Sequence, residues 1–222
     1  MGRFYVRSSV RPSLHLSVRP SGDSPTKPRI NGNESLNDVE VTVERVKRLI
    51  DEMKEKAAPG PDGFPPILLK IVCEEIAVPM TILFRKSMDE GQIPDDWRTI
   101  NVTPIYKKGN HAEPGNYRPV SLTSVIGKLM ERLVKKEIDG YIEQNALIRE
   151  TQHGFRRGHS PQTNLIKFCN ITTRWHDEGE CFDVIYLDFA KAFDKVCHKR
   201  LLVKLEAIGI GGKLIDWIKD ES

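Results

Sequence analysis

The chain has 222 residues, 39% of them hydrophobic and 29% charged, which is the balance of a globular protein and excludes global disorder. Its net charge of +3 permits nucleic-acid binding without predicting it, because local clusters of cations matter more than the total. No apolar run approaches the roughly 18 residues that a membrane span needs, so we expect no membrane partner. The four cysteines form no C-x-x-C pair, which indicates reduced thiols in an intracellular protein, nuclear or cytoplasmic.

Residues 1–36 differ in composition from the rest of the chain. The segment Ser-Val-Arg-Pro-Ser occurs at residues 9–13 and again at 17–21, and no acidic residue precedes Asp23. Such a sequence buries too little apolar surface to offset its ordering entropy, so we expect a disordered low-complexity tail. Its Arg and Ser content is also typical of a mitochondrial transit peptide, but the prolines disfavour the amphipathic helix of such a peptide.

Apolar periodicity and turn residues predict the elements that follow the tail. They are a helix over residues 39–56, a turn-rich breaker over 57–63, a helix over 66–90, a strand over 100–106, a loop over 107–117 and a helix over 125–144. We expect Asn37 or Asp38 to cap the first helix and Gly91 to end the second. Asp95 and Asp96 are expected in the first turn of a short helix that ends near Trp97.

A carboxylate at the end of an apolar run is the most informative feature of the last third of the chain. Residues 161–178 form a predicted helix, and the run Val184–Leu187 then predicts a strand covered on both faces that ends at Asp188. A carboxylate in this place is either a cation ligand or a helix cap. Helices are expected again over residues 198–208 and 213–219. Helices and strands without a regular alternation favour the α+β class.

Three clusters of cations occur in predicted loops. Lys107 and Lys108 follow one strand and Arg118 opens the next, so a hairpin would present all three. Lysine supplies a point charge and arginine a bidentate fork, a combination suited to a triphosphate or a nucleic-acid backbone. The third cluster, residues 152–160, places cations between glycines and an aromatic residue. Each cluster taken alone is more often a solvated loop.

Five motifs in a fixed order change this interpretation. Together they closely resemble the reverse transcriptase domain of non-LTR (LINE-type) retrotransposons over roughly residues 37–220. The motifs are Ala-Ala-Pro-Gly-Pro-Asp-Gly-Phe-Pro at 57–65, Pro-Ile-Tyr-Lys-Lys-Gly at 104–109, Asn-Tyr-Arg-Pro-Val-Ser-Leu at 116–122, Gln-His-Gly-Phe-Arg at 152–156 and Leu-Asp-Phe-Ala-Lys-Ala-Phe-Asp at 187–194. The resemblance implies a right-handed polymerase, with fingers over 37–180 and the start of the palm over 181–222. Its partners would be an RNA template, a DNA primer and a dNTP.

The resemblance also implies roles for particular residues. Asp188 looks like the first catalytic carboxylate and, with the Phe189 carbonyl, a ligand of Mg²⁺ in a two-metal site. The amides of Lys191 and Ala192 would face the triphosphate, and Phe193 falls where the family excludes a ribose 2′-hydroxyl, unless it is a core residue.

The cation clusters acquire roles from the same resemblance. Arg118 and one of Lys107 or Lys108 match finger residues that hold the triphosphate. Residues that match a motif for template and primer contact are Gln152, Gly154, Phe155 and Arg156. The cations at 128, 132, 135 and 136 would either track template phosphates or form a solvated helix face.

Two-metal catalysis needs further carboxylates, which this family supplies in an aromatic-x-Asp-Asp hairpin after the first aspartate. The one Asp-Asp pair in this sequence, Asp95-Asp96, precedes Asp188 and follows Pro94, which disfavours a central strand. We therefore expect a C-terminally truncated domain without polymerase activity of its own. The alternatives are a non-catalytic nucleic-acid-binding remnant and a group II intron-type maturase, against which the motifs at 60–63 and 188–194 weigh by resemblance.

Overall fold

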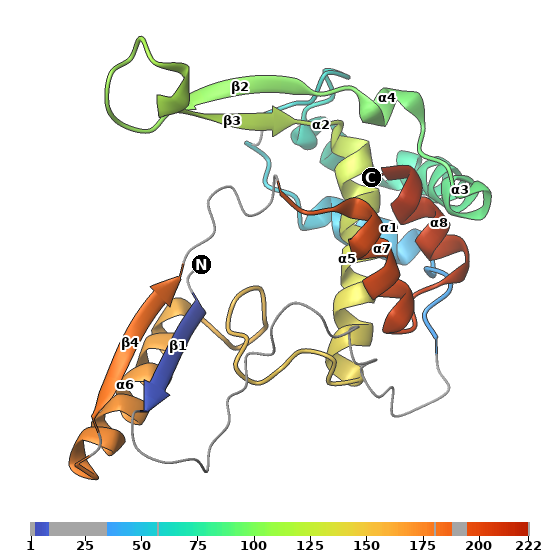
Figure 1. Cartoon of the computed structure of the whole chain (residues 1–222). Helices are drawn as coiled ribbons and strands as arrows, with labels where there is room; N and C mark the ends of the chain where they lie inside the picture. The colour runs from blue at the N-terminus through green and yellow to red at the C-terminus, as the bar shows by residue number, and fades with distance from the viewer. Residues whose placement is uncertain (1–2, 9–34, 57, 180, 188–194, 222) are drawn as a thin grey trace. The chain divides into compact units, whose positions relative to one another are not determined.

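The computed structural model describes residues 3–8, 35–56, 58–179, 181–187 and 195–221. The chain forms two compact units (Figure 1), which are unit 1 (Met1–Pro28 and Ala146–Cys197) and unit 2 (Arg29–Asn145 and His198–Ser222). Helices predominate and two small antiparallel sheets accompany them, so the α+β class is confirmed. None of the helices in the described ranges is long and apolar enough to cross a membrane. The functional division at residues 180 and 181 stays a prediction.

Unit 2 is a helical body that carries one β-hairpin. Its elements are α1 (Val43–Asp51), α2 (Pro66–Ile71), α3 (Cys73–Glu90), α4 (Asp95–Arg98), β2 (Asn101–Tyr106), the 3-10 turn η1 (Pro114–Asn116), β3 (Tyr117–Leu122), α5 (Val125–Gln144), α7 (His198–Ala207) and α8 (Gly212–Glu221). Helix α1 packs against α3 and α5, and α3 also packs against α8. Apolar side chains from these four helices are fully buried, which supplies the main favourable term in folding. They include Val46, Ile50, Phe84, Met88, Leu129, Met130 and Leu214.

Helix α8 joins this core although it lies far along the sequence from α3. The buried Trp217 indole donates a hydrogen bond to the Ser87 hydroxyl at 3.0 Å, and that hydroxyl donates to the Gln92 carbonyl at 2.6 Å. Both buried polar groups therefore have partners, as a close-packed core requires. Leu36 also pairs with Ile210 in a parallel bridge, which ties the start of the described part of unit 2 to the turn before α8.

Helix α1 (Val43–Asp51) is shorter at both ends than the predicted helix over 39–56, and the second predicted helix is interrupted. Thr42 caps α1, since its hydroxyl accepts from the Arg45 amide, so the prediction of Asn37 or Asp38 is wrong. The Asp38 carboxylate instead accepts hydrogen bonds from the Val39 amide and from the Arg85 guanidinium, with which it forms an ion pair. The predicted helix over 66–90 is divided at residue 72, where the backbone leaves helical geometry (φ −100°, ψ 24°). No glycine or proline marks this break, and backbone hydrogen bonds continue across it. The apolar periodicity therefore could not reveal it.

Other predictions in unit 2 are confirmed. The helix over 125–144 has the predicted bounds, and Gly91 ends α3 in the left-handed conformation at φ 62°. Asp95 and Asp96 lie in the first turn of α4.

Unit 1 contains strand β1 (Arg3–Ser8), helix α6 (Pro161–Asp177) and strand β4 (Phe182–Leu187). The strands are antiparallel, with Arg3 opposite Leu187 and Ser8 opposite Phe182. Helix α6 packs on β4 through two ring contacts, Phe168 with Tyr186 at 6.3 Å and Trp175 with Phe182 at 5.6 Å between centroids. Figure 1 shows α6 running alongside both strands.

One expectation for unit 1 differs from the structure. The strand before Asp188 was predicted to be covered on both faces, and this is wrong, because Ile185 is 54% and Tyr186 65% exposed. Within the described residues, β4 pairs with β1 and packs on α6, and a continuous apolar run does not distinguish one covered face from two. Within the predicted tail, Arg3–Ser8 forms β1, whose Phe-Tyr-Val run consists of residue types favoured in strands.

Candidate nucleic-acid interface

The hairpin β2–β3 presents the first two cation clusters as predicted. Its register places Tyr106 opposite Tyr117 and Ile105 opposite Arg118, and the Lys107 amide continues the ladder to the Asn116 carbonyl at 2.8 Å. Side chains alternate between the two faces of a strand, so Lys107 and Arg118 lie on the same face as Ile105. Two cations from opposite strands are thus diagonal neighbours.

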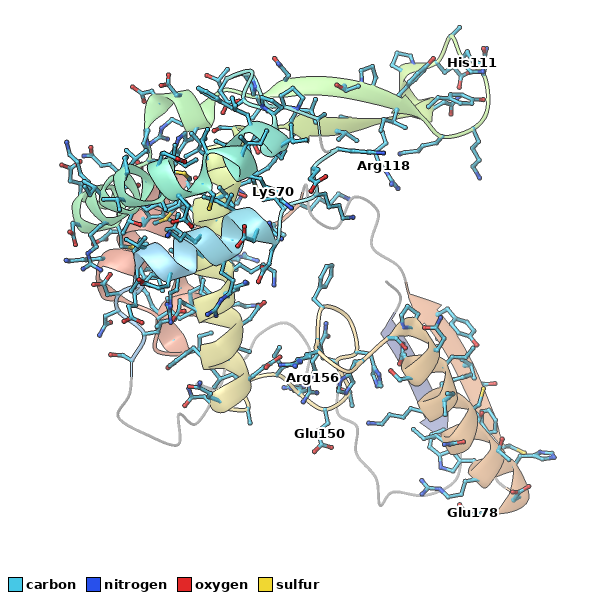
Figure 2. All side chains as sticks on the ribbon, turned by 180° about the vertical axis from the view of Figure 1, so that it is seen from behind. Lys70, His111, Arg118, Glu150, Arg156 and Glu178 are labelled. Atoms are coloured by element: carbon cyan, nitrogen blue, oxygen red, sulfur yellow. The ribbon has the colours of Figure 1, made fainter. Side chains whose placement is uncertain are left out.

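These cations are exposed and have no carboxylate partner in the described part of the chain. Every residue of β2 is exposed, as are Lys107, Lys108 and Arg118. Figure 2 shows Arg118 pointing away from β3, with His111 at the tip of the same hairpin. Exposed cations without acidic partners are available to an anion, so the hairpin is chemically suited to phosphate groups.

Aromatic contacts hold the tip of the hairpin in one conformation. The His111 ring stacks on Tyr106 at 3.8 Å, and Tyr117 meets Tyr106 edge to face at 5.7 Å. The Tyr106 hydroxyl donates to the Gly109 carbonyl at 2.6 Å, and the Tyr117 hydroxyl donates to the His111 carbonyl at 3.0 Å. Ring packing and hydrogen bonds to its own backbone therefore stabilise the loop that carries Lys107 and Lys108.

The breaker over residues 58–63 supports the root of the hairpin. Gly60 lies so close to the end of β3 that a Cβ atom there would be 2.4 Å from the Thr123 carbonyl oxygen and 2.9 Å from the Ser124 Cα. Ser124 in turn caps α5 by accepting from the Gly127 amide. Gly60, the first glycine of the Gly-Pro-Asp-Gly motif, is thus required because a backbone segment passes close to it. The sequence pattern alone did not indicate this contact.

The loop over residues 152–156 carries the third predicted cluster. Gln152 is exposed and donates to the Gly154 carbonyl at 3.2 Å, while Gly154 is buried. Phe155 is 87% exposed and has a left-handed backbone with φ 58°, a conformation that costs a non-glycine residue about 1–3 kcal/mol. Arg156 donates to the Arg149 carbonyl at 3.2 Å. A large aromatic held exposed against backbone strain is a frequent feature of binding sites.

A pocket of about 630 Å³ lies between this loop and α6, entirely within unit 1. Three of its lining residues, His153, Arg156 and His159, belong to the predicted cluster over 152–160. The lining residues are Glu150, His153, Arg156, His159, Thr163, Ile166, Lys167, Asn170, Ile171 and Arg174. The polar residues of α6 among them recur at positions 163, 167, 170 and 174, a helical spacing that identifies one face and that the sequence analysis overlooked.

His153 is the most deeply placed polar group of this pocket, with 9% of its surface exposed. Burial lowers the pKa of its imidazole below 6.5, and the nearby His159, Lys167 and Arg156 lower it further. Both effects disfavour the charged form of the ring. Its Nε2 atom has no hydrogen-bond partner among the described residues.

The predicted catalytic strand can be followed as far as Leu187. Asp188, Phe189, Lys191, Ala192 and Phe193 lie outside the described residues, so their predicted roles stay predictions. The described ranges contain no group of three or more His, Cys, Asp or Glu side chains able to hold a metal ion.

The cations of α5 are only partly available. Lys136 pairs with Glu52 at 2.7 Å, and its hydrogen bond holds the pKa of that carboxyl below the usual value. Lys135 pairs with Asp139 one turn further along the helix. Both ion pairs favour the solvated-face interpretation for these two lysines.

Comparison with known proteins places these features in a family. A family model described as reverse transcriptase (RNA-dependent DNA polymerase) matches residues 105–221. The chain is 30% identical over 169 residues to the RNA-directed DNA polymerase from mobile element jockey of Drosophila melanogaster, an alignment covering 76% of this chain and 18% of that protein. It is 30% identical over 162 residues to the probable RNA-directed DNA polymerase from transposon X-element of the same species, covering 72% and 18%.

A more distant relative is the Pol polyprotein from the type-1 retrotransposable element R2 of Popillia japonica, at 27% identity over 120 residues, covering 54% of this chain and 16% of that protein. The chain thus spans less than a fifth of the length of the relatives it matches.

Proposed function

Because the chain belongs to the reverse transcriptase (RNA-dependent DNA polymerase) family and is related to non-LTR retrotransposon polymerases, we propose that it forms the fingers and the first palm strand of such a domain. The hairpin β2–β3 then binds the triphosphate of an incoming dNTP or the phosphates of its template. The register that puts Lys107 and Arg118 on one exposed face is the observation that carries this proposal.

The loop over 152–156 is the second contact in this proposal. Its exposed and strained Phe155 offers a ring face on which a nucleobase can stack, and Arg156 beside it supplies a charge for the backbone. Template and primer strands are the ligands that this combination suits.

Asp188 is proposed as the first catalytic carboxylate. When bound, Mg²⁺ would activate the primer hydroxyl and stabilise the leaving pyrophosphate. The 222 residues contain no aromatic-x-Asp-Asp sequence, so this chain by itself lacks the other carboxylates that the family uses. We therefore propose that the isolated chain binds primer–template without extending it, and Mg²⁺-dependent dNTP incorporation by the purified chain would contradict this.

A salt titration tests the hairpin. Replacing Lys107, Lys108 and Arg118 together by alanine should weaken binding to a primed RNA template and reduce the slope of log K against log salt by about 2–3, at roughly 0.7–0.9 per phosphate contact. The matched control removes two lysines and one arginine from the exposed face of α7, at positions 199, 200 and 204. The proposal fails if both triple variants lose the same slope, because the effect would then reflect net charge alone.

A further inference from the structure

The pocket of unit 1 combines a cationic lining with one unpartnered acceptor. Arg156 from the loop and Lys167 and Arg174 from α6 line it, and the one carboxylate among the lining residues is Glu150. Figure 2 shows Arg156 and Glu150 on the loop that precedes α6. Lys167 and Arg174 are separated by about 10 Å along the helix axis, at a rise of about 1.5 Å per residue, so the face can meet more than one phosphate. Arg174 has Glu178 at 3.9 Å as an exposed partner, a weak pair that leaves its charge accessible.

The tautomer of His153 follows from the bonds of Thr163. The Thr163 hydroxyl donates its single proton to the Ser160 carbonyl at 2.9 Å and accepts from the Ser160 amide at 2.9 Å, as part of the capping box of α6. His153 Nδ1 lies 3.0 Å from the same oxygen. Because the hydroxyl proton is already used, Nδ1 must be the donor in this contact.

A neutral imidazole that donates through Nδ1 has a bare lone pair on Nε2. That atom has almost no accessible surface, lies in a residue that lines the pocket, and has no partner within the described part of the chain. A ligand donor therefore reaches it only when the side chains around it shift. A buried acceptor left unsatisfied costs about 1–3 kcal/mol, so the site favours a ligand that brings a hydrogen-bond donor. The cations around it favour a ligand that also brings negative charge.

A ribose–phosphate backbone carries both groups. Phosphodiester oxygens are anionic acceptors, and the 2′-hydroxyl is a donor that DNA lacks. We propose that the pocket binds the backbone of an RNA strand, with Arg156, Lys167 and Arg174 at the phosphates and His153 Nε2 accepting from a ribose 2′-hydroxyl. This inference rests on the proposed function and deepens it, because it assigns one nucleic-acid strand to unit 1 and a means of recognising it as RNA.

The test changes the ligand before it changes the protein. Binding of the whole chain is measured by fluorescence anisotropy to three labelled single strands of one sequence, which are RNA, 2′-fluoro RNA and DNA. The 2′-fluoro strand keeps the ribose pucker of RNA but has no 2′-donor. We expect RNA to bind about three- to tenfold more tightly than the 2′-fluoro strand, the ratio that one net hydrogen bond gives. Equal affinity for these two strands would overturn the proposal without any question of folding.

Variants then assign the preference to one side chain. His153→Phe should abolish the preference for RNA over 2′-fluoro RNA, while His176→Gln, at an exposed histidine of α6 outside the pocket, should retain it. Lys167→Ala should weaken binding of all three strands alike and leave the ratio of the RNA and 2′-fluoro RNA affinities unchanged, because it removes a charge and not the acceptor. A preference that survives His153→Phe in a folded variant would place the recognition elsewhere and refute the assignment.

The hairpin provides the separate control. Loss of Lys107, Lys108 and Arg118 should lower affinity for RNA and 2′-fluoro RNA equally. If that triple variant is without effect but the His153 ratio behaves as expected, the hairpin role is wrong and the pocket stands. If the triple variant behaves as expected but the ratio is one in the unaltered chain, the pocket inference is wrong and the hairpin role stands.

Discussion

The contact between Gly60 and the root of the hairpin gives the sharpest prediction for stability. In Gly60→Ala, the new Cβ would lie 2.4 Å from the Thr123 carbonyl oxygen and 2.9 Å from the Ser124 Cα, and both are backbone atoms that cannot rotate away. Overpacking of this kind costs about 1–3 kcal/mol, of which the stiffer unfolded chain returns about 0.4–1 kcal/mol. We expect the upper part of that range, about 2 kcal/mol net, because no flexible side chain can absorb the clash.

Gly63→Ala in the same motif is the matched control. Its backbone is left-handed at φ +70°, but a Cβ there would meet nothing within 4 Å. The cost is therefore conformational, about 1 kcal/mol for a non-glycine residue, and is largely offset by the same effect on the unfolded chain. The two variants therefore separate a steric cost at Gly60 from a conformational cost at Gly63.

Urea unfolding followed by tryptophan fluorescence measures the difference, since Trp97 and Trp217 report on unit 2. With a urea dependence of about 2 kcal/mol per molar, Gly60→Ala should lower the midpoint by about 1 M and Gly63→Ala by a quarter of that or less. Gly60→Ala should also weaken primer–template binding, because the strand that carries Arg118 enters α5 at this contact. Equal midpoints for the two variants would refute the argument from close approach.

Three further predictions concern polar groups. Ser87→Ala removes the acceptor of the buried Trp217 indole and should destabilise unit 2 by about 1–3 kcal/mol in the same unfolding assay, whereas a serine change on exposed β3 should have little effect. The hydrogen bond from Lys213 is the main cause that lowers the pKa of Asp89 below 3.8, so Asp89→Asn should cause a small loss of stability at neutral pH that shrinks in high salt and below pH 3.8. The pKa of His153 is lowered below 6.5, so the unfolded chain binds that proton first as the pH falls. Its contribution to stability is therefore complete above pH 6.5 and declines below it, a dependence that calorimetry should find absent in His153→Phe.

Short-range signals predicted the parts of the structure that local chemistry decides. Helix α5 and the glycine that ends α3 follow from periodicity and from the left-handed preference of glycine. The hairpin follows from two strand segments joined by a loop, whereas its register was not predicted. The cap of α1 was misassigned because Asp38 is a better capping type than Thr42, and its carboxylate instead pairs with the distant Arg85.

Long-range contacts account for what the sequence did not predict. Nothing near Gly60 in the chain indicates that Thr123 will approach it. Likewise, His153 appeared only as a member of a cation cluster, and its meaning depends on burial beside Thr163 on α6. Pairing of β4 with β1 joins residues almost the whole length of the chain apart, which no window of local periodicity samples.

The distribution of charge explains why a net charge of +3 was a poor guide to binding. Some cations of the helical body are neutralised locally, as Arg85 is by Asp38 and Lys136 by Glu52. Lys107 and Arg118 have no carboxylate partner among the described residues, and they lie on the hairpin for which we propose a nucleotide contact. A cation without a carboxylate partner can bind a phosphate without first breaking an ion pair. Because the balance between the signs is local, positive charge is available on the hairpin although the net charge of the whole chain is only +3.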